Sequence, residues 1–162
     1  MEQLAMMLKE RLTEDLKAAM RARDEARLRT IRALRAALLE REIAERKGGK
    51  ATLTPEQELE VLQKEAKRRR EAIEQFQAAG RDDLVQKETE ELRIIESYLP
   101  RQLNDEEIRK VHEEIIETLG ARSVRELGQV MKEAMARLRG QAEGRRISEL
   151  ARELLTQREA AS

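Results

Sequence analysis

The spacing of the apolar residues constrains this chain more than any other feature of its sequence. These residues recur every three or four positions, and no segment alternates apolar and polar residues as a half-buried strand does. The opening segment shows the pattern most simply, with leucine at every fourth position: Leu4, Leu8, Leu12 and Leu16. The sequence therefore predicts an all-α protein.

Four helices are expected in the N-terminal part. The second is capped by Asp24, the third opens with the capping box and helical proline of residues 54–57, and the fourth is capped by Asp82. The first three are expected to end at three sites: near Arg23, at Gly48–Gly49 and at Gly80.

Three further helices are expected in the C-terminal part. Asn104 with Glu107 and Ser123 with Glu126 are capping boxes for the first two, and the third follows Gly140 and Gly144. Pro100 disfavours helical backbone at the residue before it. We therefore expect a four-helix N-terminal domain over residues 1–99 and a three-helix C-terminal domain over residues 100–162.

Composition narrows the class of protein further. Charged residues make up 41% of the chain and aromatic residues only 1%, which is typical of helices with narrow apolar stripes and solvated outer faces. With no cysteine, the chain has no disulfide and no thiolate chemistry. No apolar run is long enough for a signal peptide or a membrane span, so we expect a cytoplasmic protein without a membrane partner.

The sequence offers no catalytic constellation. His112 is the only histidine, and its place beside Val111 and Ile115 predicts a boundary or surface position. One imidazole without a partner forms neither a dyad nor a metal site. No serine has an adjacent base, and no P-loop or HExxH motif occurs. We expect no catalytic residue, no metal and no cofactor.

Positive charge is concentrated near the last predicted turn. Residues 122–146 contain seven Lys or Arg against three acids, a local charge of about +4 in a chain of net charge +0. A second basic cluster lies early in the chain: Arg21, Arg23, Arg27, Arg29, Arg32 and Arg35. The short basic run 67–70 is followed by acids. Each cluster is explained either by a solvated helix face or by contact with a phosphate backbone.

Three glycines coincide with the C-terminal cluster. Gly128 interrupts a predicted helix at a cost of about 1 kcal/mol relative to alanine. Either close helix–helix packing or backbone approach to an RNA phosphate or a protein partner explains it. Gly140 and Gly144 are expected to end one helix and shape the entry to the next.

Three motifs make the chain resemble a known family. They are residues 76–84 (FQAAGRDDL), 98–103 (YLPRQL) and 127–132 (LGQVMK). On these residues the chain resembles the GatB/YqeY family, whose C-terminal part is similar to the tail domain of the B subunit of the glutamine-dependent aminoacyl-tRNA amidotransferase. The resemblance implies a two-domain helical fold with a tail-like C-terminal domain.

The resemblance also implies affinity for tRNA in the C-terminal domain. Together with the charge cluster, it predicts an RNA-binding set: Gly128, Lys132, Arg137, Arg139, Gly140, Gly144, Arg145 and Arg146. The chain departs from its relatives at Gln129 and Gln141, where GKVM and GRADG are usual. Two cations of the family pattern are therefore absent.

The leading hypothesis is a non-catalytic tRNA-binding or tRNA-related accessory protein. Recognition would be of backbone and shape, since stacking aromatics are nearly absent. Two alternatives stay open. One is an auxiliary component of the amidotransferase, with the carbon–nitrogen ligase label of the family. The other is a helical adaptor that docks on a tRNA-modifying or amidotransferase enzyme. The sequence leaves the oligomeric state open.

Overall fold

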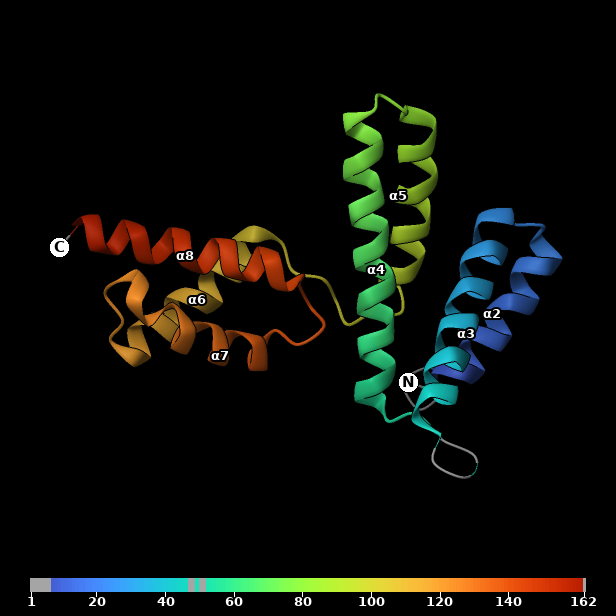
Figure 1. The fold of residues 1–162 in the computed structure, drawn as a ribbon, viewed down its shortest axis with the longest axis horizontal. Helices are drawn as coiled ribbons and strands as arrows, with labels where there is room; N and C mark the ends of the chain where they lie inside the picture. Colours follow the sequence, from blue (N-terminus) through green and yellow to red (C-terminus); the bar gives the residue numbers. More distant parts are fainter. Residues whose placement is uncertain (1–6, 47–48, 50–51, 162) are drawn as a thin grey trace. The chain divides into compact units, whose positions relative to one another are not determined.

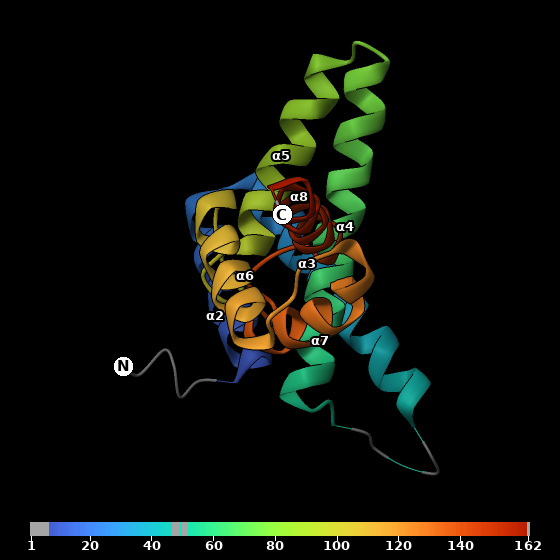
Figure 2. The same cartoon turned by 90° about the vertical axis from the view of Figure 1, so that its left-hand side faces the viewer.

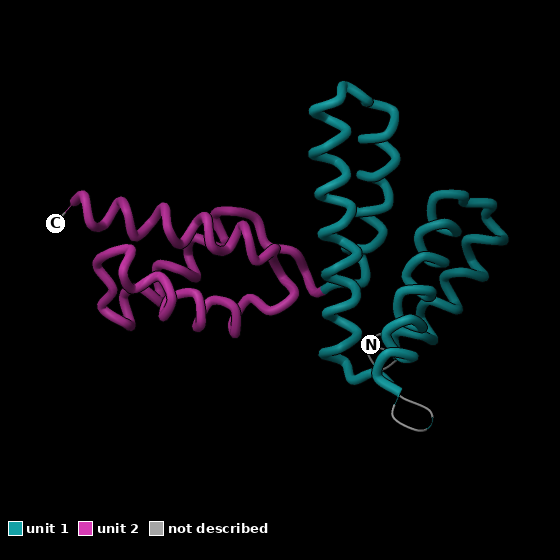
Figure 3. The backbone as a smooth tube through the Cα atoms, viewed as in Figure 1, with its two compact units in different colours: residues 1–99 teal, residues 100–162 magenta. Residues whose placement is uncertain are grey.

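The computed structural model describes residues 7–46, 49 and 52–161. Within these residues it contains seven α-helices, one 3₁₀ turn and no strand, which confirms the all-α prediction (Figure 1). Contacts divide the chain into two compact units, Met1–Leu99 and Pro100–Ser162 (Figure 3). Each unit has its own apolar core.

The first unit consists of two helix pairs. Helix α2 (Leu8–Ala22) packs on α3 (Glu25–Glu45). Helix α4 (Pro55–Ala78) lies beside the shorter helix α5 (Asp82–Glu96) (Figures 1 and 2). Helix α3 contacts both members of the second pair. Its buried side chains, spaced three and four residues apart, form the centre of the core: Ile31, Leu34 and Leu38.

Side-chain caps set the starts of α3 and α4 in this unit, whereas α2 and α5 have none. The Asp24 carboxylate accepts from the Arg27 amide, and Thr54 with Gln57 forms the predicted capping box ahead of Pro55. The prediction that Asp82 caps α5 is wrong. Arg81 occupies the N-cap position, and Asp82 is the first helical residue, where its charge favours the helix dipole instead. Helix α3 ends at Glu45 with Arg46 as its C-cap, before the predicted end at Gly48–Gly49, of which Gly48 lies outside the described residues.

A buried ion network joins three helices of the first unit. Arg69 on α4 is 3.1 Å from a Glu65 oxygen and 3.5 Å from a Glu91 oxygen on α5, and Arg29 on α3 approaches Glu91 at 3.5 Å. Side chains of Arg69, Glu65 and Glu91 are only 13%, 7% and 7% exposed. Burial of charges this far from water is costly unless they are paired. The network therefore ties α3, α4 and α5 together.

The second unit is a three-helix bundle. Helix α6 (Asp105–Leu119) is followed by a 3₁₀ turn, η1 (Val124–Glu126), then α7 (Leu127–Arg137) and α8 (Gly144–Ala161). Each helix contacts the other two (Figure 2). The bundle is closed by fully buried side chains from all three helices: Ile108, Ile115, Ile116, Val130, Ile147, Leu150 and Leu155.

Two capping predictions have different outcomes in this unit. Asn104 and Glu107 form the predicted capping box at the start of α6. The capping box predicted for Ser123 and Glu126 is wrong. Ser123 accepts from the Arg125 amide, while the Glu126 carboxylate accepts from the Arg122 amide. The Glu126 amide donates to the Ser123 carbonyl at 3.1 Å and closes a 3₁₀ turn, so α7 starts only after it.

The predicted boundary or surface position of His112 is also wrong. The imidazole is fully buried, and its Nε2 lies 2.8 Å from the Ile147 carbonyl oxygen on α8. The carbonyl can only accept, so Nε2 carries the proton. Nδ1 is buried without a hydrogen-bond partner among the described residues. Burial therefore lowers the pKa of His112, and the bond to Ile147 opposes this effect.

Candidate nucleic-acid interface

The predicted RNA-binding residues lie on α7, on α8 and in the turn between them. This turn is held against the segment before α6 by two hydrogen bonds. The side-chain amide of Gln102 donates to the Gly140 carbonyl at 2.7 Å, and the backbone amide of Leu103 donates to the Gln141 carbonyl at 2.8 Å. Gly140 is buried and has a φ of 76°, in the left-handed region that favours glycine. Gly144 is the first residue of α8. Both glycines thus shape the chain reversal.

Carboxylates neutralise the arginines at the start of α8. The Arg146 guanidinium donates to Asp105 at 3.0 Å and to Glu149 at 2.9 Å, while Arg145 donates to Glu149 at 3.1 Å. The guanidinium of Arg146 holds the pKa of Asp105 below its usual value, and Arg146 and then Arg145 do the same for Glu149. These two arginines contribute less positive potential than the sequence count implies.

The remaining arginines of the turn have partners as well. Arg137, at the end of α7, lies 3.4 Å from a Glu114 oxygen on α6. Arg139 is exposed and also has an interacting neighbour. The charge of about +4 counted along the sequence therefore does not form one unopposed cationic surface at the turn.

A different part of the predicted set remains open to solvent. Residues on one face of η1 and α7, spaced three and four apart, are all exposed: Arg125, Gly128, Gln129, Lys132 and Ala136. Among the residues that the structure describes, neither Arg125 nor Lys132 has an ion-pair partner. We call this surface the α7 face. It combines accessible positive charge with little side-chain bulk.

Gly128 leaves the helix backbone accessible in the middle of the α7 face. A Cβ atom at this position would meet nothing within 4 Å in the described structure, so the close-packing explanation of this glycine is wrong. Gly128 is exposed in the part of the chain that the structure describes. A phosphate backbone or a protein surface can therefore approach α7 closely here.

The open surroundings of Gly128 predict that alanine stabilises the second unit. Gly128→Ala is expected to raise its free energy of unfolding by about 0.5–1 kcal/mol, because alanine restricts the unfolded chain and favours the helix. Urea unfolding followed by ¹H–¹⁵N signals of α6 and α8 measures this change. A loss of stability would mean that the glycine backbone makes a contact that alanine obstructs.

The described residues offer no metal site or membrane-spanning helix. They contain no group of three or more His, Cys, Asp or Glu placed to hold a metal ion. None of the helices in 7–46 and 52–161 combines the length and the apolar character needed to cross a bilayer.

Comparison with known proteins identifies a family and relatives that match much of the chain. The model of a protein family described as Yqey-like protein matches residues 9–155. A relative in Pyrenophora tritici-repentis, named altered inheritance of mitochondria protein 41, mitochondrial, is 34% identical over 137 residues, which cover 82% of this chain and 71% of the relative. A protein of the same name in Eremothecium gossypii is 40% identical over 88 residues, covering 54% of this chain and 46% of that relative.

These relatives correct one prediction. The cytoplasmic location expected from the composition is wrong on this comparison, because both relatives are mitochondrial proteins by name. The prediction rested on the lack of an apolar leader, and apolar character alone does not report the compartment of a helical, charge-rich protein.

Proposed function

Because the chain belongs to the YqeY-like family, we propose that it is a non-catalytic accessory protein that binds tRNA through the α7 face of its second unit. The observation that carries the proposal is the exposure of Arg125 and Lys132, without ion-pair partners among the described residues, on either side of the open backbone at Gly128. Similarity to the amidotransferase tail supplies the class of ligand.

The composition of the surface fits recognition of the RNA backbone. The chain has one Phe and one Tyr, and both lie in the first unit, where Tyr98 is buried. The α7 face therefore holds cations and small residues but no aromatic ring on which a base could stack. Lysine and arginine neutralise phosphates regardless of sequence, and they release counterions on binding.

Filter binding with a panel of tRNAs, mitochondrial tRNA included, tests the proposal. If two to four phosphates are neutralised, log affinity should fall with log salt with a slope of roughly −2 to −4. Lys132→Ala should weaken binding to every tRNA and make this slope shallower by about 1.

Arg145→Ala is the matched control for Lys132→Ala. Arg145 is also exposed, but it is bonded to Glu149, so its removal should change the salt slope less. The proposal fails if tRNA does not bind at low salt, or if the two substitutions weaken binding equally. An auxiliary role in the glutamine-dependent amidotransferase is supported only by the family resemblance. Transamidation that proceeds unchanged without this protein would exclude it.

A further inference from the structure

Helix α3 presents an apolar and basic stripe that the proposed RNA contact does not use. Leu39 and Ile43 are 52% and 54% exposed and lie one turn apart. The helical repeat brings further exposed residues to the same side: Arg32, Arg35 and Ala36 before them and Arg46 after them. We call these six residues the α3 stripe. Its two large apolar side chains are flanked by cations at both ends.

A groove runs beside the α3 stripe, between α2 and α3. Its volume is about 330 Å³. Apolar and polar side chains of both helices line it: Lys9, Leu12, Thr13, Arg35, Leu39 and Glu42. The Glu42 side chain is only 9% exposed and is paired with Lys9. Arg35, Ala36 and Leu39 of the stripe therefore form one wall of a concave surface with a polar pair within it.

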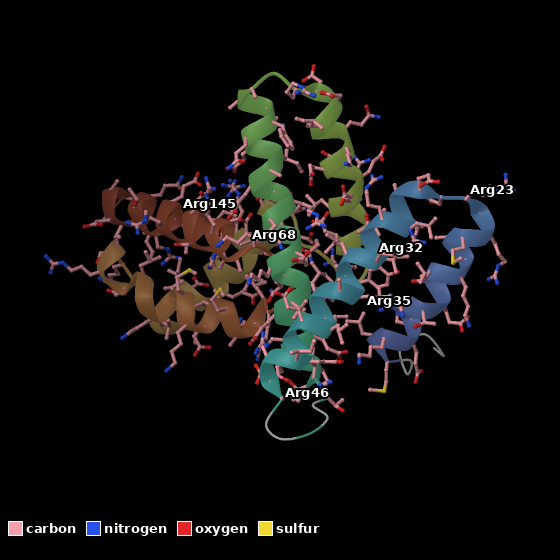
Figure 4. All side chains as sticks on the ribbon, turned by 45° about the vertical axis from the view of Figure 1, so that its right-hand side comes forward. Arg23, Arg32, Arg35, Arg46, Arg68 and Arg145 are labelled. Carbon is pink, nitrogen blue, oxygen red and sulfur yellow. The ribbon has the colours of Figure 1, made fainter. Side chains whose placement is uncertain are left out.

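The flanking arginines differ from their neighbours on α3, because those neighbours are paired with carboxylates. Arg27 pairs with Asp24, Arg29 with Glu91, and Arg41 with both Glu45 and Glu60. Among the described residues no carboxylate pairs with Arg32, Arg35 or Arg46, which follow one another along α3 to its C-terminal end (Figure 4). The charges along the stripe are thus available to an external anion.

We propose that the α3 stripe and its groove dock an amphipathic helix of a protein partner. Apolar side chains one turn apart on that helix pack on Leu39 and Ile43, and carboxylates near its two ends meet the arginines. Residues 32 and 46 are 14 positions apart, about 21 Å along a helix, so the partner segment needs roughly four turns. This inference concerns the first unit and is independent of the α7 face.

The chemistry of the stripe favours such a helix over other ligands. An RNA backbone has no group that would cover two exposed aliphatic side chains at the centre of the stripe. An anionic lipid surface is flat, whereas this surface is concave and holds a carboxylate, Glu42. A second copy of the chain fits poorly too, because its acidic helix α6 buries its own apolar side chains in the bundle.

Three synthetic 16-residue helical peptides test the proposal by fluorescence anisotropy. All three carry leucines one turn apart at the centre. They differ at their ends, which carry glutamate in the first peptide, serine in the second and lysine in the third. The glutamate peptide should bind the full chain at least tenfold more tightly than the lysine peptide. Leu39→Ser/Ile43→Ser should weaken this binding at least tenfold. Met20→Ser is the matched control, since Met20 is 55% exposed on α2 and lies outside the groove; it should change nothing.

A charge swap examines the arginines directly. Arg32→Glu/Arg35→Glu should reverse the order of the affinities, so that the lysine peptide binds more tightly than the glutamate peptide. Arg23→Glu is the control: it lies at an exposed position before α3 and should leave the order of the affinities unchanged. Equal binding of the two charged peptides, or binding that survives the Leu39/Ile43 double substitution, overturns the proposal. So does failure of the peptides to bind while anionic vesicles or tRNA bind through Leu39 and Ile43. Lys132→Ala should leave peptide binding unchanged.

Discussion

Replacement of Arg69 by methionine is expected to lower the free energy of unfolding of the first unit by about 3–5 kcal/mol. Methionine retains most of the side-chain volume, so the loss comes from charge and not from a cavity. Glu65 and Glu91 would remain buried, and Glu65 would keep only its contact with the more exposed Arg68. Glu91 would keep only its contact with Arg29, whose side chain is 42% exposed. Both buried carboxylates would thus lose their least exposed partner, and weakening the pairing of a buried charge is costly.

Urea unfolding followed by tyrosine fluorescence measures this loss. The chain has one tyrosine, Tyr98 in the first unit, and no tryptophan, so the signal reports that unit alone. Arg68→Met is the matched control: Arg68 also contacts Glu65, but its side chain is 66% exposed, so the expected cost is about 0–1 kcal/mol. A second variant, Arg69→Met/Glu91→Gln, should recover part of the stability. Equal effects of the Arg68 and Arg69 substitutions would contradict the assigned role of the network.

The parts of the fold that the sequence predicted are those fixed by neighbouring residues. The capping boxes at Thr54 and Asn104 form because each donor and acceptor pair lies within one turn. The same local pattern failed at Ser123, where Glu126 bonds the Arg122 amide instead. Two competing local partners of similar energy cannot be ranked from a motif alone.

Longer-range pairing explains why the candidate site was only partly predictable. A count of charges along the sequence does not show that Arg146 meets Asp105 or that Arg137 meets Glu114, 41 and 23 residues away. A signal for Arg69 did exist in the sequence. It lies at helical spacing from Ala66 and Ile73, on the apolar side of α4, within a basic run explained there by a solvated face or a phosphate contact. Gly128 and Lys132 entered the predicted set through the charge cluster and the family resemblance, and the structure leaves both exposed.

Acidification is expected to destabilise the second unit through His112. Burial lowers the folded-state pKa of this imidazole below its ordinary value of 6.5, and a proton added at Nδ1 would find no acceptor among the described residues. At pH values between the folded-state pKa and 6.5, His112 is therefore protonated in the unfolded chain but not in the folded chain. The stabilising contribution is fully present above pH 6.5 and is lost as the pH falls towards the folded-state pKa, with a limiting slope of about 1.4 kcal/mol per pH unit.

Urea unfolding at a series of pH values between 5 and 7.5, followed by ¹H–¹⁵N signals of α6 and α8, measures this dependence apart from Tyr98. His112→Gln is the control, because glutamine keeps an amide donor for the Ile147 carbonyl but does not titrate; its stability should be flat over this range. Asp105, Glu107 and Glu149 do not interfere, since their pKa values are lowered from ordinary values of 3.8 and 4.5. A wild-type profile as flat as that of the glutamine variant would mean that the folded unit accepts the proton, which requires water or an acceptor at Nδ1.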